Sequence, residues 1–388
     1  MIGFERKVSS LTELEALGLV GLESELDSIQ LDRISNIKNN WNFYEGFHWE
    51  QIPENDKPEI TTNFCRIFCD KLVAFELGKA LTFKCGDEST IVTKDGRTLF
   101  EYLEDVWEDN NQYLFATELG LMKSVTGDAW VKVSYVPQED LDDPFSKYDN
   151  GRLRIDLMNT STVFPEYEPH DKDTLRKLTI MYPIEIVTSN PLTFKESKKR
   201  VMFKQIWTKD EIVEFEGSKE ISRIPNKYKV IPFVQIKNLP LPGKSYGRSD
   251  IDDVIPLNIE YNMKQSDISE ILDYHSAPIT LVYGAKISNL EKGANKVWGG
   301  LPDKSRVENL NMQTDLAASN IYLSSLKLSM CEVASVPETC LGGAQAISNT
   351  SGVALQYINL PLIEKTRIKR SNTENGFPAA PVQTFGPG

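Results

Sequence analysis

The sequence is poor in the residues from which catalytic and metal centres are usually built. Its three histidines, His48, His170 and His275, are scattered along 388 residues. Five cysteines occur at irregular spacing, and an odd number argues against a disulfide framework. Cys65 and Cys69 stand one helical turn apart, but no second pair completes a zinc site, so we interpret both as buried apolar residues. We therefore expect neither a metal nor a cofactor.

Long apolar runs are also missing. A membrane-spanning helix needs about 18 or more consecutive apolar residues. The longest candidate here, around residues 277–285, has only the length of a strand. Charged residues near the N-terminus are not followed by the apolar block of a secretory signal. These absences predict a protein that is made in the cytoplasm and does not enter a membrane.

An excess of positive charge is the third absence. The chain has 43 Lys and Arg against 56 Asp and Glu, a formal net charge of −13. Proteins that hold nucleic acid through its phosphates need the opposite sign. Two interpretations remain open: the protein never meets nucleic acid, or it encloses a polyanion without holding it. The composition does not choose between them, although 40% hydrophobic residues suffice for a sizeable core.

The spacing of apolar residues predicts an α+β fold. Helical periodicity indicates helices at residues 11–39 (interrupted near 18–21), 63–77 and 99–122. Alternating apolar and polar residues predict strands at residues 129–136, 152–157, 178–182 and 201–207, so the chain is expected to be rich in strands from about residue 129 to 234.

The character of the sequence changes after Pro240. Ser249 is expected to open a long helix with Asp252 as its capping partner, while Asp250 and Asp253 favour the positive helix end. Pro256 predicts a kink or a restart in the first two turns. Further helices are expected at residues 314–335 and 351–369, and a strand at 278–283. Residues 371–388, rich in proline and glycine, are expected to form a disordered tail.

Two short patterns imitate enzyme motifs. Gly243-Lys244-Ser245 matches the end of a phosphate-binding loop, but Asn238 stands where that loop needs its first glycine. Asp250, Asp252 and Asp253 could suggest a magnesium site, yet a helix N-terminus explains the same residues. No Gly-x-Ser-x-Gly elbow is present. We therefore expect no catalytic residues and no enzyme activity.

Several segments together resemble the portal proteins of tailed bacteriophages. Residues 246–258 (YGRSDIDDVIPLN) resemble the entry to the portal stem helix, and Asn262, Ser266, Asp267 and Tyr274 continue the pattern. The likeness continues through the segments 335–337, 341–342, 351–355 and 361–365, and near the N-terminus through 44–46, 63–66 and 70–71. Each segment alone is weakly specific, but their order and spacing cover most of residues 35–370.

The resemblance implies an architecture. It assigns residues 1–248 to an α+β wing, 249–276 and 311–335 to the two stem helices, 277–310 to a small α/β clip, 336–350 to a tunnel loop and 351–370 to a helix on the wing or crown side. Family members commonly continue into a helical crown after this helix, where the present sequence has only the tail at 371–388.

The resemblance also implies a function and partners. Portal proteins form a ring, usually of twelve subunits, at one capsid vertex of the virion. DNA is packaged and ejected through their channel without sequence recognition. The implied partners are further copies of the chain, double-stranded DNA, the terminase large subunit, a major capsid or scaffolding protein and a head–tail adaptor. The acidic charge suits such a channel, because carboxylates repel phosphates and leave DNA free to slide.

Candidate site residues follow from this architecture. Asp267, Glu270 and Asp273 are expected to include channel-facing stem positions. The tunnel-loop candidates are Leu341, Gly342, Gly343, Ala344, Gln345, Ser348 and Asn349. Candidates for contact with terminase or adaptor are the basic residues Lys286, Lys292, Lys296, Lys304 and Arg306, which could equally be ordinary surface charges. The alternative function is a structural capsid or adaptor protein that has no channel.

Overall fold

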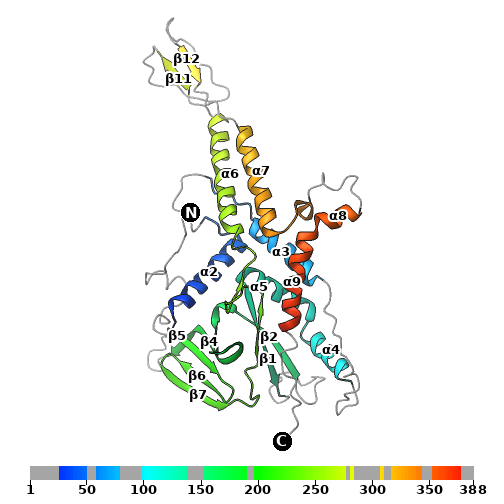
Figure 1. The fold of residues 1–388 in the computed structure, drawn as a ribbon. Coiled ribbons are helices and arrows are strands. Elements are labelled where there is room, and N and C mark those ends of the chain that lie inside the picture. The colour runs from blue at the N-terminus through cyan, green and yellow to red at the C-terminus, as the bar shows by residue number, and fades with distance from the viewer. Residues whose placement is uncertain are drawn as a thin grey trace.

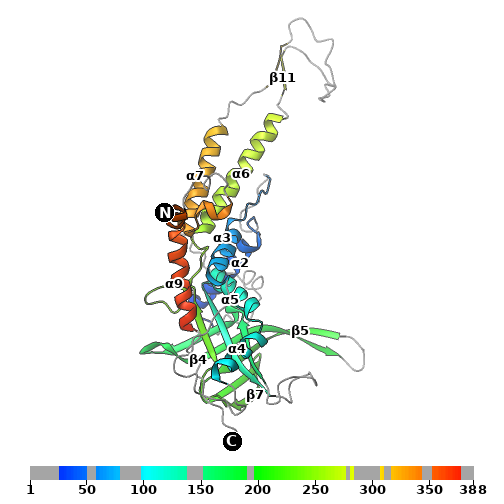
Figure 2. The ribbon, with the colours of Figure 1, turned by 90° about the vertical axis from the view of Figure 1, so that its right-hand side faces the viewer.

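A computed structural model describes residues 26–49, 58–78, 98–137, 152–189, 196–276, 280–283, 306–309, 316–342 and 352–376. The described chain is elongated. Its base contains two antiparallel sheets, a group of helices lies over them, and two long helices project away from this base (Figure 1). Figure 2 shows the same projection from the side. The α+β class predicted from the sequence is confirmed.

The two larger sheets occupy the part of the chain that alternation had marked as strand-rich. The first has the order β2-β1-β8, and the second is a meander with the order β3-β4-β5-β6-β7. Their strands are β1 (Asp128–Val136), β2 (Arg152–Met158), β3 (Val163–Glu168), β4 (Asp171–Ser189), β5 (Glu196–Trp207), β6 (Glu211–Glu216), β7 (Lys219–Pro225) and β8 (Phe233–Lys237). Trp130, Leu178 and Trp207 belong to one buried cluster that joins the two sheets.

Four helices precede the sheets in the described chain, and α2 and α3 are the first two of them. α2 (Ser28–Glu45) begins where the Asp27 carboxylate accepts a hydrogen bond from the amide of Gln30 at 2.8 Å. It ends at Gly46, whose φ of 101° is a left-handed conformation suited to glycine. The helix therefore continues beyond its predicted end at residue 39. α3 (Phe64–Leu77) is capped by Asn63, and its predicted range is confirmed.

The single helix predicted at residues 99–122 is wrong. The structure has α4 (Leu99–Asp109) and α5 (Gln112–Thr126), separated by Asn110 and Asn111. Asn111 adopts φ 53°, a left-handed conformation that asparagine tolerates better than most residues. The Asn110 side chain donates to the Leu153 carbonyl oxygen at 3.0 Å and accepts from the Ile155 amide at 3.0 Å, so its contacts with β2 compensate for the broken helix.

The two projecting helices are α6 (Val254–Ser276) and α7 (Leu316–Ala334), which pack along each other. The predicted helix start at Ser249 is wrong: residues 249–253 form a turn, and the amides of Val254 and Ile255 both donate to the Ile251 carbonyl oxygen at 2.9 Å. Pro256 consequently lies in the first helical turn, where its missing amide costs no intrahelical bond. α6 is one continuous helix from Val254 to Ser276, so the restart predicted at Pro256 does not occur.

Small elements surround these helices. β9 (Leu239–Pro240) pairs with β10 (Gly247–Arg248), and η4 (Glu338–Leu341) is a short 3-10 helix after α7. β11 (Thr280–Tyr283) and β12 (Arg306–Asn309) form an antiparallel pair beyond the far ends of α6 and α7 (Figure 1). η3 (Thr160–Thr162) connects β2 to β3.

The end of the described chain differs from prediction. The expected helix at 351–370 is divided into α8 (Gly352–Ile358) and α9 (Leu360–Gly376), with Asn359 between them and Pro361 near the new start. The tail expected from residue 371 is helical as far as Gly376, because Thr373 packs into the interior at 2% exposure. Residues 377–388 lie outside the described chain.

One hydrophobic core ties the projecting helices to the base. It contains Phe68 and Leu72 of α3, Val254 of α6, Met330 of α7 and Leu362 of α9, all nearly inaccessible. Cys65 and Cys69 are fully buried in the same core, as predicted from their spacing. Burial of each large apolar side chain contributes roughly 1.5–3 kcal/mol to folding stability. This core therefore attaches α6 and α7 stably to the base.

Candidate functional site

The root of α6 presents a row of buried polar side chains. Asn258, Asn262 and Ser266 are all inaccessible to solvent. They stand four residues apart and therefore share one face of the helix. We call these three residues the polar ladder. A buried polar group must find a hydrogen-bond partner to be tolerated, so the ladder needs a matching set of donors and acceptors.

The partners come from an extended segment before α3, residues 58–63, which we call the strap. The Thr62 amide donates to Asn262 Oδ1 at 3.0 Å, and Asn258 Nδ2 donates to the Thr62 carbonyl oxygen at 2.8 Å. The Ile60 amide reaches Ser266 Oγ at 3.5 Å. Alternate residues of an extended chain rise by ~6.6 Å and four helical residues by ~6 Å, so the two repeats match.

The ladder also caps α3. Asn258 Oδ1 accepts from the amides of Phe64 at 3.0 Å and Cys65 at 3.3 Å, which begin that helix and have no partner within it. The strap thus runs antiparallel to α6 and positions the start of α3 beside α6. Thr62 Oγ1 adds a bond of 2.8 Å to Gln265 Oε1 beside the ladder.

The outer side of α6 is charged. Asp267 is 29% exposed and forms an ion pair with Lys264 at 3.1 Å, while Glu260 lies 3.9 Å from the same Lys264. The hydrogen bond to Asp267 raises the pKa of Lys264. Glu270 and Asp273 are exposed farther along the helix. The structure therefore places all three acidic stem candidates on the same helix and outside the core.

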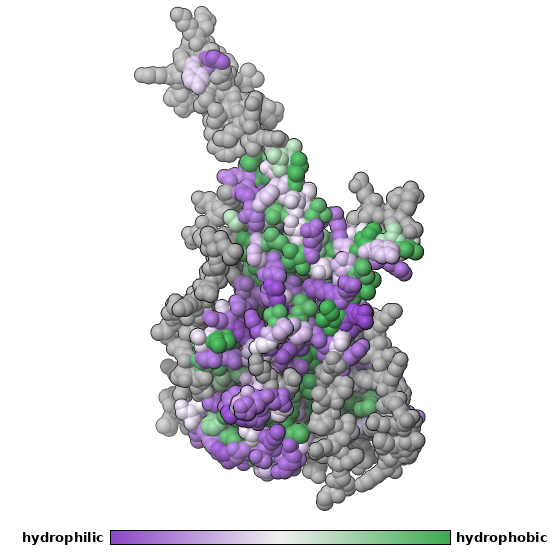
Figure 3. Space-filling model, viewed as in Figure 1, coloured by the Kyte–Doolittle hydropathy of each residue, from purple (hydrophilic) through white to green (hydrophobic). Residues whose placement is uncertain are grey.

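The outer side of α7 is different. Lys327 and Glu332 are its only charged residues, and Lys327 is paired with Glu338 at 2.6 Å. Its large exposed side chains are apolar or aromatic: Ile321 (70%), Tyr322 (45%), Leu328 (49%) and Val333 (44%). Figure 3 shows apolar residues reaching the surface along the projecting helices and around α8. Such a surface is typical of a protein–protein contact.

A cluster of charged side chains lies below the root of α6. Glu76 of α3, Lys123 of α5, Asp250 of the 249–253 turn and Lys369 of α9 have no exposed side-chain surface. We call these four residues the charge cluster. Lys123 Nζ contacts Glu76 Oε1, and Lys369 Nζ lies 2.6 Å from Asp250 Oδ2 and 3.4 Å from Glu76 Oε2. Opposite charges therefore alternate through the interior.

Neighbouring groups complete the cluster. Ser124 Oγ donates to Asp250 Oδ2 at 2.7 Å, and Lys123 Nζ donates to the Thr373 hydroxyl at 2.6 Å. Lys365, near the edge, adds an ion pair with Asp250 Oδ1 at 3.0 Å. α3, α5, α9 and the turn before α6 are thereby joined through their charges.

The buried charges shift one another's protonation. Burial alone would raise the pKa of Asp250, but the ammonium groups of Lys369 and Lys365 hold it well below its usual range. Burial alone would lower the pKa of Lys369, whereas Asp250 and Glu76 raise it. Burial lowers the pKa of Lys123, and Glu76 opposes that shift. Pairing, rather than water, keeps Asp250 and Lys369 charged.

Sequence reasoning missed this cluster. Asp250 was interpreted as a residue favouring the N-terminus of a helix, and the structure instead buries it against two lysines. Asp252 bonds the Ser249 amide at 3.2 Å, and Asp253 pairs with Arg248 at the surface. A usable signal existed: Glu76 and Lys123 each interrupt an otherwise apolar helical face.

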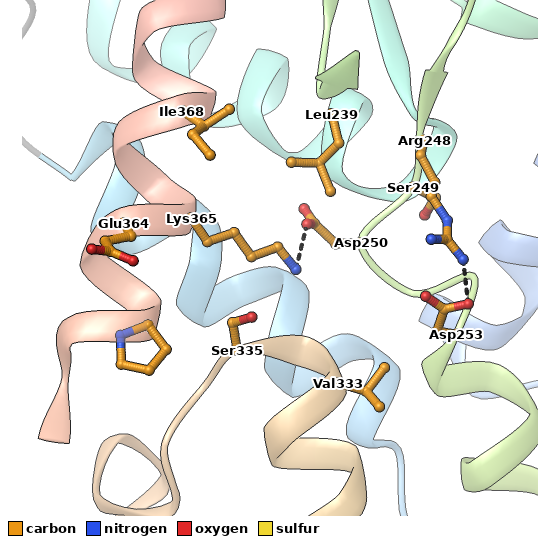
Figure 4. A pocket seen from close by; sticks show the side chains of 11 residues that line it. Leu239, Arg248, Ser249, Asp250, Asp253, Val333, Ser335, Glu364, Lys365 and Ile368 are labelled. Carbon is orange, nitrogen blue, oxygen red and sulfur yellow. Dashed lines mark hydrogen bonds and ion pairs between the residues drawn. The ribbon is translucent and has the colours of Figure 1, made fainter. Parts of the chain in front are cut away.

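An open pocket of about 450 Å³ lies over the edge of the cluster, between α9, the end of α7 and the 239–253 segment. Figure 4 shows Lys365 extending from α9 to Asp250, and Arg248 turned toward Asp253. Apolar side chains surround these pairs: Leu239, Val333, Pro361 and Ile368. The charged groups of Lys365, Asp250, Arg248 and Asp253 are already paired with one another, so they do not form a cation or anion site in this pocket.

Neither enzyme-like motif forms a site. Gly243, Lys244 and Ser245 lie in the turn that joins β9 to β10, and Gly243 has φ 79°. Of the three aspartates at 250–253, Asp250 pairs with Lys365 and Lys369, whereas Asp252 and Asp253 both pair with Arg248. Within the described ranges, no group of three or more His, Cys, Asp or Glu could hold a metal ion.

Most of the tunnel-loop and clip candidates lie outside the described residues. Leu341 ends η4, and Gly342 follows it with φ 92°. Arg306 is exposed at the start of β12. The others, Gly343, Ala344, Gln345, Ser348, Asn349, Lys286, Lys292, Lys296 and Lys304, fall in segments that the structure does not describe.

Comparison with known proteins identifies the family. None of the helices in the described part is both long and apolar enough to cross a bilayer. No curated protein matches the chain significantly. The profile of a family described as phage portal protein, SPP1 Gp6-like, matches residues 23–379, nearly the whole chain. That family is structural and not enzymatic, and its members are capsid components of the virion. The chain therefore belongs to the phage portal proteins, the head–tail connectors through which viral genomes are packaged.

Proposed function

We propose that twelve copies of the chain close into a ring around a channel for double-stranded DNA, at one vertex of the capsid. The main support for this proposal is that the chain matches the portal family across residues 23–379 and that two long helices project from a broad base. In this proposal α6 and α7 form the stem, β11 and β12 belong to the clip, and the sheets and remaining helices of residues 26–248 form the wing.

The exposed face of α7 is the proposed contact between subunits. Ile321 and Leu328 are large apolar residues that a lone chain would leave in water. A cyclic ring joins two different faces of each subunit, so α7 of one copy would meet another surface of its neighbour. In this proposal, burial of these apolar side chains between subunits supplies the free energy of ring assembly, and no ion pair is needed.

The acidic residues of α6 are proposed to include the channel wall. Asp267, Glu270 and Asp273 lie outside the core, and a net charge of −13 on each subunit is repeated around the ring. Carboxylates repel DNA phosphates, so the wall conducts the polymer without binding it. The loop at 336–350 would enter the channel, and the clip at 277–310 would meet the terminase large subunit or a head–tail adaptor. The wing would face a capsid or scaffolding protein.

Electron microscopy of the purified full chain tests the ring. We expect holed particles of high rotational symmetry, with a mass near twelve subunits by native mass spectrometry. An Ile321→Asp variant should dissociate these rings at least tenfold more readily, because a charge would have to be buried in each contact. Ser325→Asp tests the same face, and Glu185→Asp, far from the stem, is the matched control.

The alternative function makes a different prediction. A structural capsid or adaptor protein without a channel would give monomers or particles without a central hole. Either result for the wild-type chain would overturn the ring. Rings that persist unchanged in both aspartate variants would leave the ring standing and remove α7 as its contact.

A further inference from the structure

His48 occupies a buried position between the helices of the base and the stem. Its side chain is inaccessible to solvent, and its ring packs against Phe43 with centroids 4.9 Å apart. Nε2 lies 2.9 Å from the Phe43 carbonyl oxygen, and Nδ1 lies 2.7 Å from Asn262 Nδ2. His48 therefore touches α2 on one side and the polar ladder of α6 on the other.

The partners determine which ring nitrogen carries the proton. A carbonyl oxygen only accepts, so Nε2 must carry hydrogen. The Asn262 amide oxygen is committed to the Thr62 amide, so its nitrogen faces His48 and donates to Nδ1. Nδ1 must then be unprotonated, and the imidazole is neutral. The orientation of the Asn262 side-chain amide and the tautomer of His48 are therefore consistent with each other.

A second proton on His48 cannot be accommodated in this arrangement. A protonated Nδ1 would place its N–H against the N–H of Asn262, donor against donor. Rotating the Asn262 amide by half a turn would supply an oxygen to His48, but it would turn the amide nitrogen toward the Thr62 N–H. One of the two contacts is lost in either case.

We propose that His48 and Asn262 form a proton-sensitive latch that holds the strap on the stem helix α6 while His48 is neutral and releases it when His48 is protonated. The inference rests on these contacts of a single chain and is independent of ring formation. Trp49, the next residue, also touches the strap, since its Nε1 donates to Thr61 Oγ1 at 2.9 Å.

Among the described residues, His48 has no charged partner. α2 presents Phe43, the strap presents Asn63 and α6 presents Asn262, none of which titrates. Asn63 already accepts a hydrogen bond from the Arg66 amide at 2.9 Å as the cap of α3. Burial lowers the pKa of His48, and the bonds to Phe43 and Asn63 oppose this shift. Acid therefore opens the latch rather than closing it.

The sign follows from linkage. With a lowered pKa in the closed state and an ordinary pKa near 6.5 when open, the open form binds more protons below about pH 6.5. Opening should then increase by up to about tenfold for each pH unit, from about 6.5 down to the pKa of the closed state. Above pH 7.5 it should not depend on pH.

Two substitutions separate this device from ordinary acid unfolding. His48→Gln keeps one donor and one acceptor but cannot take up a proton in this range, so its strap should show no opening between pH 7.5 and 5. Asn262→Asp supplies a carboxylate that accepts from both the Thr62 amide and a protonated His48. It raises the pKa of His48, so its strap should open as the pH rises and close as it falls.

Hydrogen exchange with mass spectrometry measures the opening directly. In the full-length protein, peptides covering residues 58–66 report the amides of Ile60, Thr62 and Phe64, with exposure times scaled for the intrinsic pH dependence of exchange. Peptides from β6 (residues 211–216) provide the reference, since they lie in the distant sheet. Opposite pH dependence in wild type and Asn262→Asp supports the latch.

The opposite results overturn it. If the wild-type strap showed the same protection at pH 5 and pH 7.5, protonation of His48 would not weaken the contact between the strap and α6. An Asn262→Asp strap that opens in acid as the wild type does would show that His48 is not the sensor. Should His48→Gln fail to fold, the reversal in Asn262→Asp still decides the question.

Discussion

The root of α6 is fastened to the rest of the protein in two chemically different ways. On one side the polar ladder holds the strap through neutral amides, each of which both donates and accepts. On the other side the charge cluster joins the 249–253 turn to α9 through buried ammonium and carboxylate groups. Loss of one partner leaves the other unsatisfied in both attachments, but a buried charge without its partner costs more free energy than a buried neutral amide. The two attachments should therefore differ greatly in their sensitivity to substitution.

The largest effect is expected from removing one charge of the cluster. Asp250→Asn leaves Lys369 and Lys365 without their shared carboxylate. Breaking a buried pair in this way typically costs about 3–5 kcal/mol of unfolding free energy. Urea denaturation followed by tryptophan fluorescence measures the loss. Asp253→Asn is the matched control: its side chain is 54% exposed, and loss of its pair with Arg248 should cost at most about 1 kcal/mol.

Removing both members of a pair should be less harmful than the single changes suggest. In Asp250→Leu with Lys369→Met, each substitution removes the buried charge that the other would leave without its nearest partner, and Lys365, near the edge, still loses Asp250. The loss should fall at least about 1 kcal/mol short of the sum of the two single losses. Independent, additive losses in this double-mutant cycle would show that Asp250 and Lys369 do not depend on each other.

A moderate effect is expected in the ladder. Asn258→Ala removes the acceptor of the Cys65 amide and leaves the Phe64 amide only the Thr62 carbonyl oxygen at 3.2 Å, so it should cost about 1–3 kcal/mol in the same denaturation assay. Ser266→Ala removes a long contact of 3.5 Å with the Ile60 amide and the bond of 3.1 Å that Ser266 Oγ donates to the Asn262 carbonyl oxygen within α6, and it should cost less than about 1 kcal/mol. Equal losses for both would mean that the ladder acts through packing rather than hydrogen bonds.

Much of the architecture could be predicted from local patterns. The alternation at residues 129–136 and the helical periodicity at residues 63–77 depend on near neighbours in sequence, and the structure bears them out. The break at Asn110 could not be predicted in this way, because its side chain is satisfied by β2, more than 40 residues away. Local helical periodicity carries no information about such a partner.

The candidate site was predicted less completely for the same reason. The charge cluster unites residues as far apart as Glu76 and Lys369. The apolar face around Glu76 signals that its carboxylate is buried, but nothing near it in the sequence identifies Lys369 as its partner. Similarly, Asn262 was noticed only as part of a family-like pattern, although its physical role is to hold Thr62. Long-range pairing of polar groups is set by the fold, and hydrophobic spacing does not encode it.

The length of α6 turns small motions at its root into larger ones at its tip. Its 23 residues span roughly 34 Å from the base toward β11 and β12. A tilt of one degree at the root would displace the far end by roughly 0.6 Å, so about eight degrees would move it by the distance between neighbouring strands of a sheet, roughly 4.8 Å. The helix acts as a lever: the residues packed around Val254 and Asn258 hold its root, and their packing sets the position of its far end.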